Sequence, residues 1–373
     1  FNKKAINVDK ESAVGMMLEN NSTDVVKANV TAENTGVITL KDSTPNKENI
    51  GILAKKNSTA INKDNGIINV NSVKSIGMLA KEGSKLENNT TIPTNPPGVG
   101  QEYGINLKAE DGVGMLAEGK NSKNEVSTAV NNGKINIIST AKKSIGMYAK
   151  DSGDVKNNKE IEVLAENGVG IFVSDTGTGT NLNGAKITLD SRNAVGIFAQ
   201  NNGTANTRSV VKNTKIINVS KEGSAGILGD KSTITNSGTE TTEGIKLTAK
   251  KTAGIIGKKD SVVNNTGRIE TKTATPSGSS EGLVGISLNA STGTNSGDII
   301  LGTAHSTGMN GVASSTVINA KNITGNKENV VGMAVNASTA TNTDKGTITL
   351  NGLTSTGMFG AVGSTVTNAG KIE

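Results

Sequence analysis

One short segment recurs thirteen times along the 373 residues, and it limits the possible folds more than any other feature. It reads small residue, β-branched residue, Gly, Met or Ile, usually Leu or Phe, then Ala or Gly, as in residues 143–149. Consecutive segments lie 23 to 37 residues apart. A period in the twenties that lengthens by insertion is typical of a β-solenoid, because loops can leave each coil at fixed corners. The anchor glycines of these segments are Gly15, Gly51, Gly77, Gly114, Gly146, Gly170, Gly196, Gly226, Gly254, Gly285, Gly308, Gly332 and Gly357.

A second pattern, Asn-x-Gly-x-Ile-x-Leu, follows many anchor segments, for example at residues 34–40, 131–137 and 295–301. Its aliphatic residues alternate strictly, which indicates β-strands. We predict three short strands in each repeat, and equivalent strands stacked in parallel between coils. The predicted fold is all-β: a parallel β-helix of about 13 coils that runs as one continuous segment over residues 1–373, with loop insertions.

The period of two along a strand predicts which residues fill the core. The residues directly before and after each anchor glycine should share the inner face. Seven of the eight methionines follow an anchor glycine directly, where a flexible side chain can fill a core of varying width. We therefore expect Val14, Ile50, Met16 and Ile52, with their equivalents in later coils, to be buried.

A second apolar column stands two residues after each anchor glycine. Strict alternation would place it outside, where a large apolar patch usually binds a partner. Alternatively, a bend at the glycine turns the column inward, or insertions cover it, and we favour this alternative slightly, because strands often bend at small residues. The candidate binding surface comprises Tyr103, Tyr148, Phe172 and Phe198.

An asparagine column precedes the third strand of the repeats. Asparagine tolerates tight turns, and its amide can bond an equivalent amide in the next coil. We predict a corner ladder here, and a calcium site is much less favoured because no carboxylate cluster accompanies the column. The column contains Asn34, Asn131, Asn157, Asn213, Asn236, Asn265, Asn295, Asn319 and Asn368.

The largest predicted insertion spans residues 85–103 and carries three of the five prolines. Loops commonly hold functional residues, so function is expected there first. The spacing tightens toward the C-terminus, and residues 283–373 should form the most regular coils.

Residues that carry chemistry are almost absent. The chain has no cysteine and one histidine, His305, which we expect in a surface turn, so zinc binding and thiol chemistry are excluded. Lysine and acidic residues are interleaved, without an arginine or aromatic cluster, which argues against nucleic-acid binding. No apolar run is long enough to span a membrane as a helix. We predict no catalytic residue, no cofactor and no metal site.

The recurring Ser-x-Gly-Met-x-Ala and Asn-x-Gly-x-Ile-x-Leu patterns, in a cysteine-free chain rich in Lys and Asn, resemble the passenger repeats of large fusobacterial autotransporter adhesins. The resemblance covers essentially the whole chain. It implies a right-handed β-helix stalk, part of a longer chain with a signal peptide upstream and a membrane β-barrel downstream. It also implies a position at the cell surface, outside the outer membrane, and adhesion to receptors or glycans on other bacteria or host cells.

Two alternatives remain beside an adhesive surface stalk. β-Helices also occur in polysaccharide lyases and hydrolases, but aromatic residues for sugar stacking make up only 2% of this chain and tryptophan is absent. The third possibility is a spacer that displays a distal binding tip and binds nothing itself.

Overall fold

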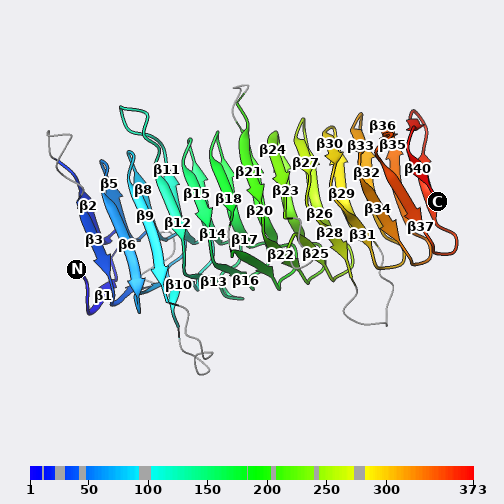
Figure 1. Cartoon of the computed structure of the whole chain (residues 1–373). Coiled ribbons are helices and arrows are strands. Elements are labelled where there is room, and N and C mark those ends of the chain that lie inside the picture. Colours follow the sequence, from blue (N-terminus) through cyan, green and yellow to red (C-terminus); the bar gives the residue numbers. More distant parts are fainter. Residues whose placement is uncertain are drawn as a thin grey trace. The chain divides into compact units, whose positions relative to one another are not determined.

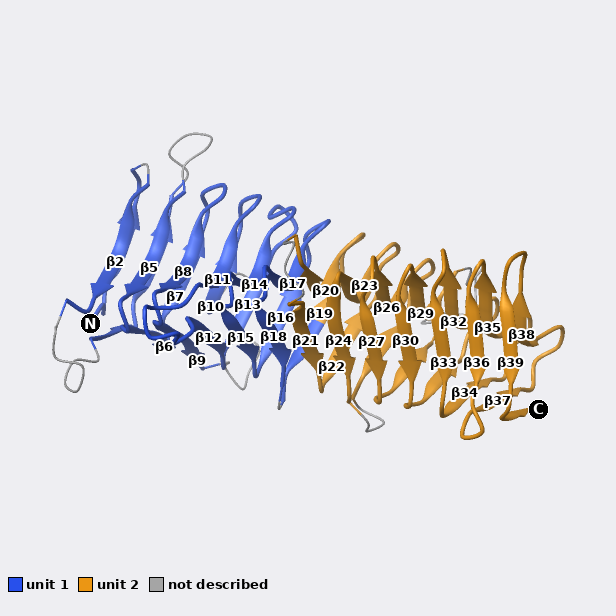
Figure 2. Ribbon diagram, turned by 90° about the horizontal axis from the view of Figure 1, so that it is seen from above, with its two compact units in different colours: residues 1–187 blue, residues 188–373 orange. Residues whose placement is uncertain are grey.

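The computed structural model describes residues 1–10, 12–21, 30–41, 48–91, 102–182, 184–202, 207–238, 243–272 and 282–373. These residues form 40 β-strands and no helix. The chain divides into two compact units, unit 1 (Phe1–Ile187) and unit 2 (Thr188–Glu373) (Figure 2). The prediction of one continuous segment over residues 1–373 stays a prediction.

Unit 1 is built from three parallel sheets of six strands each (Figure 1). The glycine sheet, named for its anchor glycines, contains β2 (Val14–Glu19), β5 (Ile50–Lys55), β8 (Ile76–Lys81), β11 (Val113–Glu118), β14 (Ile145–Lys150) and β17 (Val169–Ser174). The asparagine sheet contains β3 (Thr31–Asn34), β6 (Thr59–Asp64), β9 (Lys85–Thr90), β12 (Thr128–Asn131), β15 (Asp154–Asn157) and β18 (Thr178–Asn181). The aliphatic sheet contains β1 (Ala5–Val8), β4 (Val37–Leu40), β7 (Ile67–Val70), β10 (Gly104–Leu107), β13 (Lys134–Ile137) and β16 (Glu160–Val163).

Unit 2 repeats the three sheets, and β19 (Lys186–Leu189) spans the boundary in sequence. Its glycine sheet contains β20 (Val195–Gln200), β23 (Ala225–Asp230), β26 (Ala253–Lys258), β29 (Val284–Asn289), β32 (Thr307–Val312), β35 (Val331–Asn336) and β38 (Thr356–Gly360). Its asparagine sheet contains β21 (Ser209–Asn213), β24 (Ser232–Asn236), β27 (Val262–Asn265), β30 (Thr292–Asn295), β33 (Thr316–Asn319), β36 (Thr339–Asn342) and β39 (Thr365–Asn368). Its aliphatic sheet contains β22 (Ile216–Val219), β25 (Ile245–Leu247), β28 (Ile269–Thr271), β31 (Ile299–Leu301), β34 (Asn322–Gly325), β37 (Thr347–Leu350) and β40 (Lys371–Ile372).

Both units are right-handed parallel β-helices with three strands per coil, as predicted. Each strand pairs in register with the strand of the same sheet in the next coil, for example Ile68 of β7 with Ile105 of β10, and Ile105 with Ile135 of β13. All three isoleucines have no exposed surface. The alternation predicted for the aliphatic sheet is confirmed, and this sheet supplies one wall of the core.

The predicted asparagine ladder is also confirmed. The side-chain Nδ2 of Asn131 donates to Oδ1 of Asn157 in the next coil at 2.8 Å and to the carbonyl of Glu160 at 3.2 Å, and Asn88 donates to Asn131 at 2.7 Å. These amides are fully buried, so each bond satisfies a group that water cannot reach. The ladder has more members than predicted, and the added ones are Asn2, Asn62, Asn88, Asn181 and Asn342.

The start of the predicted insertion at residues 85–103 is wrong. Residues Lys85–Thr90 form β9, which pairs with β6 and β12. Leu86 of β9 faces the core and has no exposed surface. Residues 92–101, the proline-containing part of the predicted insertion, lie outside the described residues. The stretch 283–373, predicted to be most regular, is fully described and contains the strands β29 to β40.

Candidate interaction surface

All thirteen anchor glycines stand second in a strand of the glycine sheet, and there the strands depart from strict alternation. In β8, Gly77 and Met78 both face the core, Leu79 faces out and Ala80 faces in. Ile76, directly before the glycine, is only half-buried and lies on the outer side with Leu79. The prediction that residues on both sides of the glycine share the core is therefore wrong for the residue before it, because two consecutive residues turn inward.

Close approach between coils explains why glycine stands at this inward position. A Cβ built on Gly77 would lie 2.6 Å from the carbonyl oxygen of Gly114 in the next coil and 3.3 Å from Cγ2 of Ile105. At Gly146 the corresponding distances are 2.6 Å to the Gly170 oxygen and 3.1 Å to Ile161. Any side chain would push consecutive coils apart, so the anchor segment is first a packing requirement.

The column two residues after each glycine lies on the outer side of the strands, so the favoured inward bend is wrong, but its leucines in β5, β8 and β11 are nevertheless buried. In unit 1 this column and the one before the glycine run in register across the six strands. Leu53, Leu79 and Leu116 pack together with only 4–7% of their surfaces exposed. We call these two columns of unit 1 the outer apolar face: Val14, Met17, Ile50, Leu53, Ile76, Leu79, Val113, Leu116, Ile145, Tyr148, Val169 and Phe172.

Two candidate residues meet on this face. The rings of Tyr148 and Phe172 have centroids 4.8 Å apart at 35°, so each ring covers a face of the other. The Tyr148 hydroxyl lies 3.0 Å from Oγ of Ser174, and burial raises the pKa of Tyr148. Sugar rings stack on open aromatic faces, whereas these stacked rings share theirs. The pair is therefore better suited to contacts with another protein than to sugar stacking.

The other two candidate residues lie elsewhere. Phe198 belongs to β20 of unit 2 and takes the same outward position in its own strand. Tyr103 precedes β10 of the aliphatic sheet, where Nζ of Lys134 lies 5.5 Å from its ring centroid. Burial lowers the pKa of Lys134, but its hydrogen bond to Glu162 and the nearby carboxylates outweigh this, and the pKa is raised overall. Tyr103 therefore lies outside the glycine-sheet strands that carry the other three candidate residues.

Charged residues border the outer apolar face on both sides. At the ends of the strands, Glu118 accepts ion pairs from Lys81 at 3.0 Å and from Lys150 at 3.3 Å. Burial raises the pKa of Glu118, but the two lysines outweigh it, and the pKa is lowered overall. The full column at this border is Glu19, Lys55, Lys81, Glu118 and Lys150. On the other side, exposed corner residues stand two positions before each strand: Glu48, Lys74, Asp111 and Lys143.

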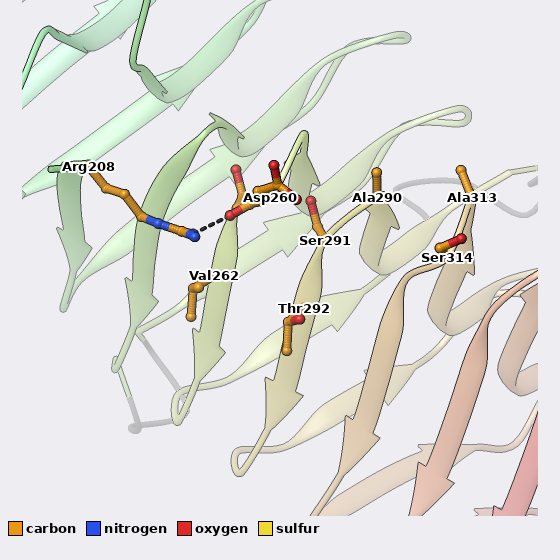
Figure 3. Close-up of a pocket in the computed structure, with 9 residues that line it drawn as sticks. Arg208, Asp260, Val262, Ala290, Ser291, Thr292, Ala313 and Ser314 are labelled. Carbon is orange, nitrogen blue, oxygen red and sulfur yellow. Dashed lines mark hydrogen bonds between the residues drawn. The ribbon is translucent and has the colours of Figure 1, made fainter. Parts of the chain in front are cut away.

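The hollow drawn in Figure 3 belongs to unit 2 and has a volume of about 240 Å³. Corner residues such as Ser261, Ser291 and Ser314 line it, and the Arg208 guanidinium donates to the carbonyl of Asp260 at its edge. The Arg208 guanidinium therefore points toward the backbone carbonyl of Asp260, as Figure 3 shows. The hollow brings hydroxyl groups together with one arginine and one aspartate, without a paired nucleophile and base.

Other chemical groups are sparse. His305 lies exposed at a corner with φ of 55°, as expected for a surface turn, and the neighbouring Ser306 donates to the Thr303 carbonyl at 2.6 Å. Across the described ranges, no three or more His, Cys, Asp or Glu side chains are placed to hold a metal ion. Within those same ranges, no helix is long and apolar enough to cross a bilayer.

A protein-family model matches part of the chain. Residues 2–184 match the family model of the BigA third pectate lyase-like domain, and all of them fall within unit 1. No curated protein and no solved structure matches the chain. Unit 1 is therefore similar to the third pectate lyase-like domain of BigA.

Proposed function

We propose that this chain is a cell-surface passenger domain that attaches the cell to other bacteria or to host cells, without catalysis. The resemblance to fusobacterial autotransporter repeats and the match to the BigA domain support the surface position. The observation that carries the adhesive role is the outer apolar face of unit 1. In β29, β32 and β35 of unit 2 the same position holds serine, asparagine and alanine, so stacking of the coils does not itself require the large apolar residues found in unit 1.

Two features make this face suitable for a protein partner. Contiguous apolar patches on soluble proteins mark interaction sites more often than chance. Aromatic and branched side chains near the centre of a patch, with charges at its rim, are the usual anatomy of a protein interface. Here Tyr148 and Phe172 lie within the patch, and the Lys81, Glu118 and Lys150 side chains border it. A protein receptor therefore fits better than a glycan.

Binding of the labelled chain to partner bacteria and epithelial cells tests the proposal. We expect saturable binding that falls at least about tenfold in Ile76→Glu, because a charge would be desolvated at the centre of the interface. Val331→Glu is the matched control, since Val331 holds the same half-buried position in β35 of unit 2. It should bind as the parent does.

Two results would reject the proposal. Absence of binding to any cell tested would favour the spacer, and equal binding by Ile76→Glu would place the contact elsewhere on the chain. Incubation of the chain with polyuronates and other polysaccharides, followed by product analysis, covers the enzymatic alternative. Turnover of any of them would replace the adhesive role with catalysis.

A further inference from the structure

We infer that the hollow of unit 2 drawn in Figure 3 is a binding site for a small zwitterionic α-amino acid, such as alanine. The inference goes beyond the proposed function, because it concerns unit 2 and requires no contact with a cell. It rests on a recess between consecutive coils, on two opposite charges at the rim of this recess, and on hydroxyl groups that line it.

The recess arises from a corner that is one residue shorter than the corners beside it. Three residues join β26 to β27 and β32 to β33, whereas only Ala290 and Ser291 join β29 to β30. The strands before these corners stay in register, since Asn289 pairs with Lys258 on one side and with Val312 on the other. The missing residue therefore leaves a gap in the row of corners. Because neighbouring strands lie about 4.8 Å apart, the two flanking corners stand about 10 Å apart, which is wide enough for a small molecule.

Two opposite charges stand at the rim of the hollow. The Arg208 guanidinium donates to the backbone carbonyl of Asp260, which holds the arginine across the edge (Figure 3). A guanidinium carries five N–H groups, so donors remain for a ligand. The Asp260 carboxylate is exposed, and among the described residues it forms no ion pair or hydrogen bond. The rim thus presents a cation and an anion that are not paired with each other.

The lining adds hydroxyl groups and small apolar groups. The Thr292 hydroxyl and the exposed Ser314 hydroxyl both line the hollow, and in the described part of the chain neither forms a hydrogen bond. Val262, Ala290 and Ala313 contribute methyl groups. A ligand that carries charge at one end and a short apolar side chain at the other would satisfy both kinds of lining.

These features fit a zwitterion better than other small ligands. A simple anion would be repelled by Asp260, and a simple cation by Arg208. An α-amino acid carries both charges one carbon apart, so its carboxylate can accept from Arg208 while its ammonium donates to Asp260. Such charge-assisted hydrogen bonds are about twice as strong as neutral ones. A neutral sugar would leave both charges unmatched, and the described residues that line the hollow include no aromatic ring on which a sugar could stack. The volume of about 240 Å³ favours a small side chain.

NMR titration of the purified chain with alanine is the first test. We expect saturable shifts of the corner amide signals with a Kd on the order of 1 mM, because the hollow is small and open to solvent. Alaninamide lacks the carboxylate and N-acetylalanine lacks the ammonium, so each should bind at least about tenfold more weakly. Absence of a saturable shift up to about 50 mM alanine, or equal binding of glucose or of either derivative, would overturn the inference.

Variants that remove one charge assign the two contacts. Arg208→Gln should weaken alanine binding about tenfold and should abolish the preference for alanine over alaninamide, because the partner of the ligand carboxylate is gone. Asp260→Asn should likewise abolish the preference for alanine over N-acetylalanine, and asparagine tolerates the φ of 62° at this position. A variant that loses affinity but keeps the preference would reject the contact assigned to that residue.

A substitution that fills the recess has a matched control. Ala290→Asn places a larger side chain in the hollow and should abolish binding, and asparagine accepts the φ of 48° there. Ala337 lies in the equivalent short corner between β35 and β36 with a φ of 46°, and the corners on either side of it carry no charged residue. Ala337→Asn should therefore bind alanine as the parent does. Equal binding by both variants would place the site elsewhere, and circular dichroism confirms that each variant is folded.

Discussion

The glycine sheets of the two units have similar residues on their inner faces and different residues on their outer faces. In β8 of unit 1 and β32 of unit 2, the glycine and the methionine after it are buried alike. The outward positions in β8 are Ile76, Leu79 and Lys81, whereas in β32 they are threonine, asparagine and valine. Stacking therefore fixes the inner residues of every coil and leaves the outer ones free to vary. What varies between the units is more informative about function than what repeats.

The contrast develops within unit 2. Outward residues two after the glycine remain large and apolar in β20, β23 and β26, become serine, asparagine and alanine in β29, β32 and β35, and return to phenylalanine in β38. The charged border fades as well, since Asn289 and Asn336 stand where β8 has Lys81 and β11 has Glu118. Apolar face and charged border weaken together, which is expected if both serve one interface.

The largest effects should come from the shared interior and should be the same in both units. Asn131→Ala removes an amide that donates to Asn157 and accepts from Asn88, leaving buried groups unpaired. We expect a loss of about 3 kcal/mol in the free energy of unfolding, measured by urea denaturation. Asn319→Ala in unit 2 breaks equivalent bonds at 2.9 and 2.8 Å and should cost the same within about 1 kcal/mol. A cost below about 1 kcal/mol at either site would show that the ladder is not essential.

The anchor glycines should come next. Gly77→Ala places a methyl group 2.6 Å from a backbone oxygen, and Gly332→Ala places one 2.5 Å from the oxygen of Gly357. Neither oxygen can move without shifting a whole coil, so we expect about 2 kcal/mol of destabilisation at both sites in the same urea experiment. Equal losses of stability would confirm that the coils of both units require glycine at this position. A substitution without effect in one unit would show that the two interiors are packed differently.

The sequence alone predicts the repeat, the three strands per coil and the parallel stacking, because these follow from spacing and from alternation in the aliphatic sheet. It placed the residue before the anchor glycine inside because period-two alternation was assumed through the glycine, where two consecutive residues turn inward, and it turned the column two after the glycine inward because a bend was favoured. A signal for the correct orientation was present. Lys55, Lys81 and Glu118 stand two residues after the apolar column, and a charged column on the same face requires that face to be outside.

Two other errors have local causes. Asn62 was not predicted to belong to the ladder, because four positions separate it from Gly66. Two positions separate Asn34 from Gly36, so Asn62 does not match the Asn-x-Gly motif. The insertion was predicted to begin at residue 85 because β9 contains charged and amide residues and resembles a loop. Its residues Leu86 and Asn88 are buried, and β9 is recognised as a strand only from its pairing with β6 and β12.

Outer-face substitutions should have smaller effects on stability and should differ between the units. Leu79→Ala removes a nearly buried side chain packed against its neighbours in adjacent coils and should cost about 1.5 kcal/mol. Ser287→Leu, at the same position in β29, should change stability by less than about 0.5 kcal/mol, because the new side chain would stand between Ile256 and the polar Asn310 and would not join a leucine cluster. Thermal and urea unfolding measure both. If Leu79→Ala costs nothing, the leucine cluster has no structural role and serves contacts with a partner alone.

The smallest effect concerns the charged border, which unit 1 has and the later strands of unit 2 lack. The pKa of Glu118 is lowered from its ordinary value of 4.5 in the folded state, so this carboxylate stabilises the fold above that pH. Its contribution is lost as pH falls through the folded pKa. Since the group lies at the surface, we expect about 0.5–1 kcal/mol. Glu118→Gln should therefore be less stable than the parent by this amount at neutral pH.

The difference between the two proteins should close as the pH falls through the lowered pKa of Glu118, below which the parental carboxylate is protonated as well. Urea denaturation at a series of pH values measures it, and subtraction of the two curves removes the titration of all other carboxyl groups. A gap that stays constant with pH would assign the effect to packing of the side chain. A gap that closes would show that the ion pairs of Glu118, and not packing of its side chain, stabilise the border of the outer apolar face.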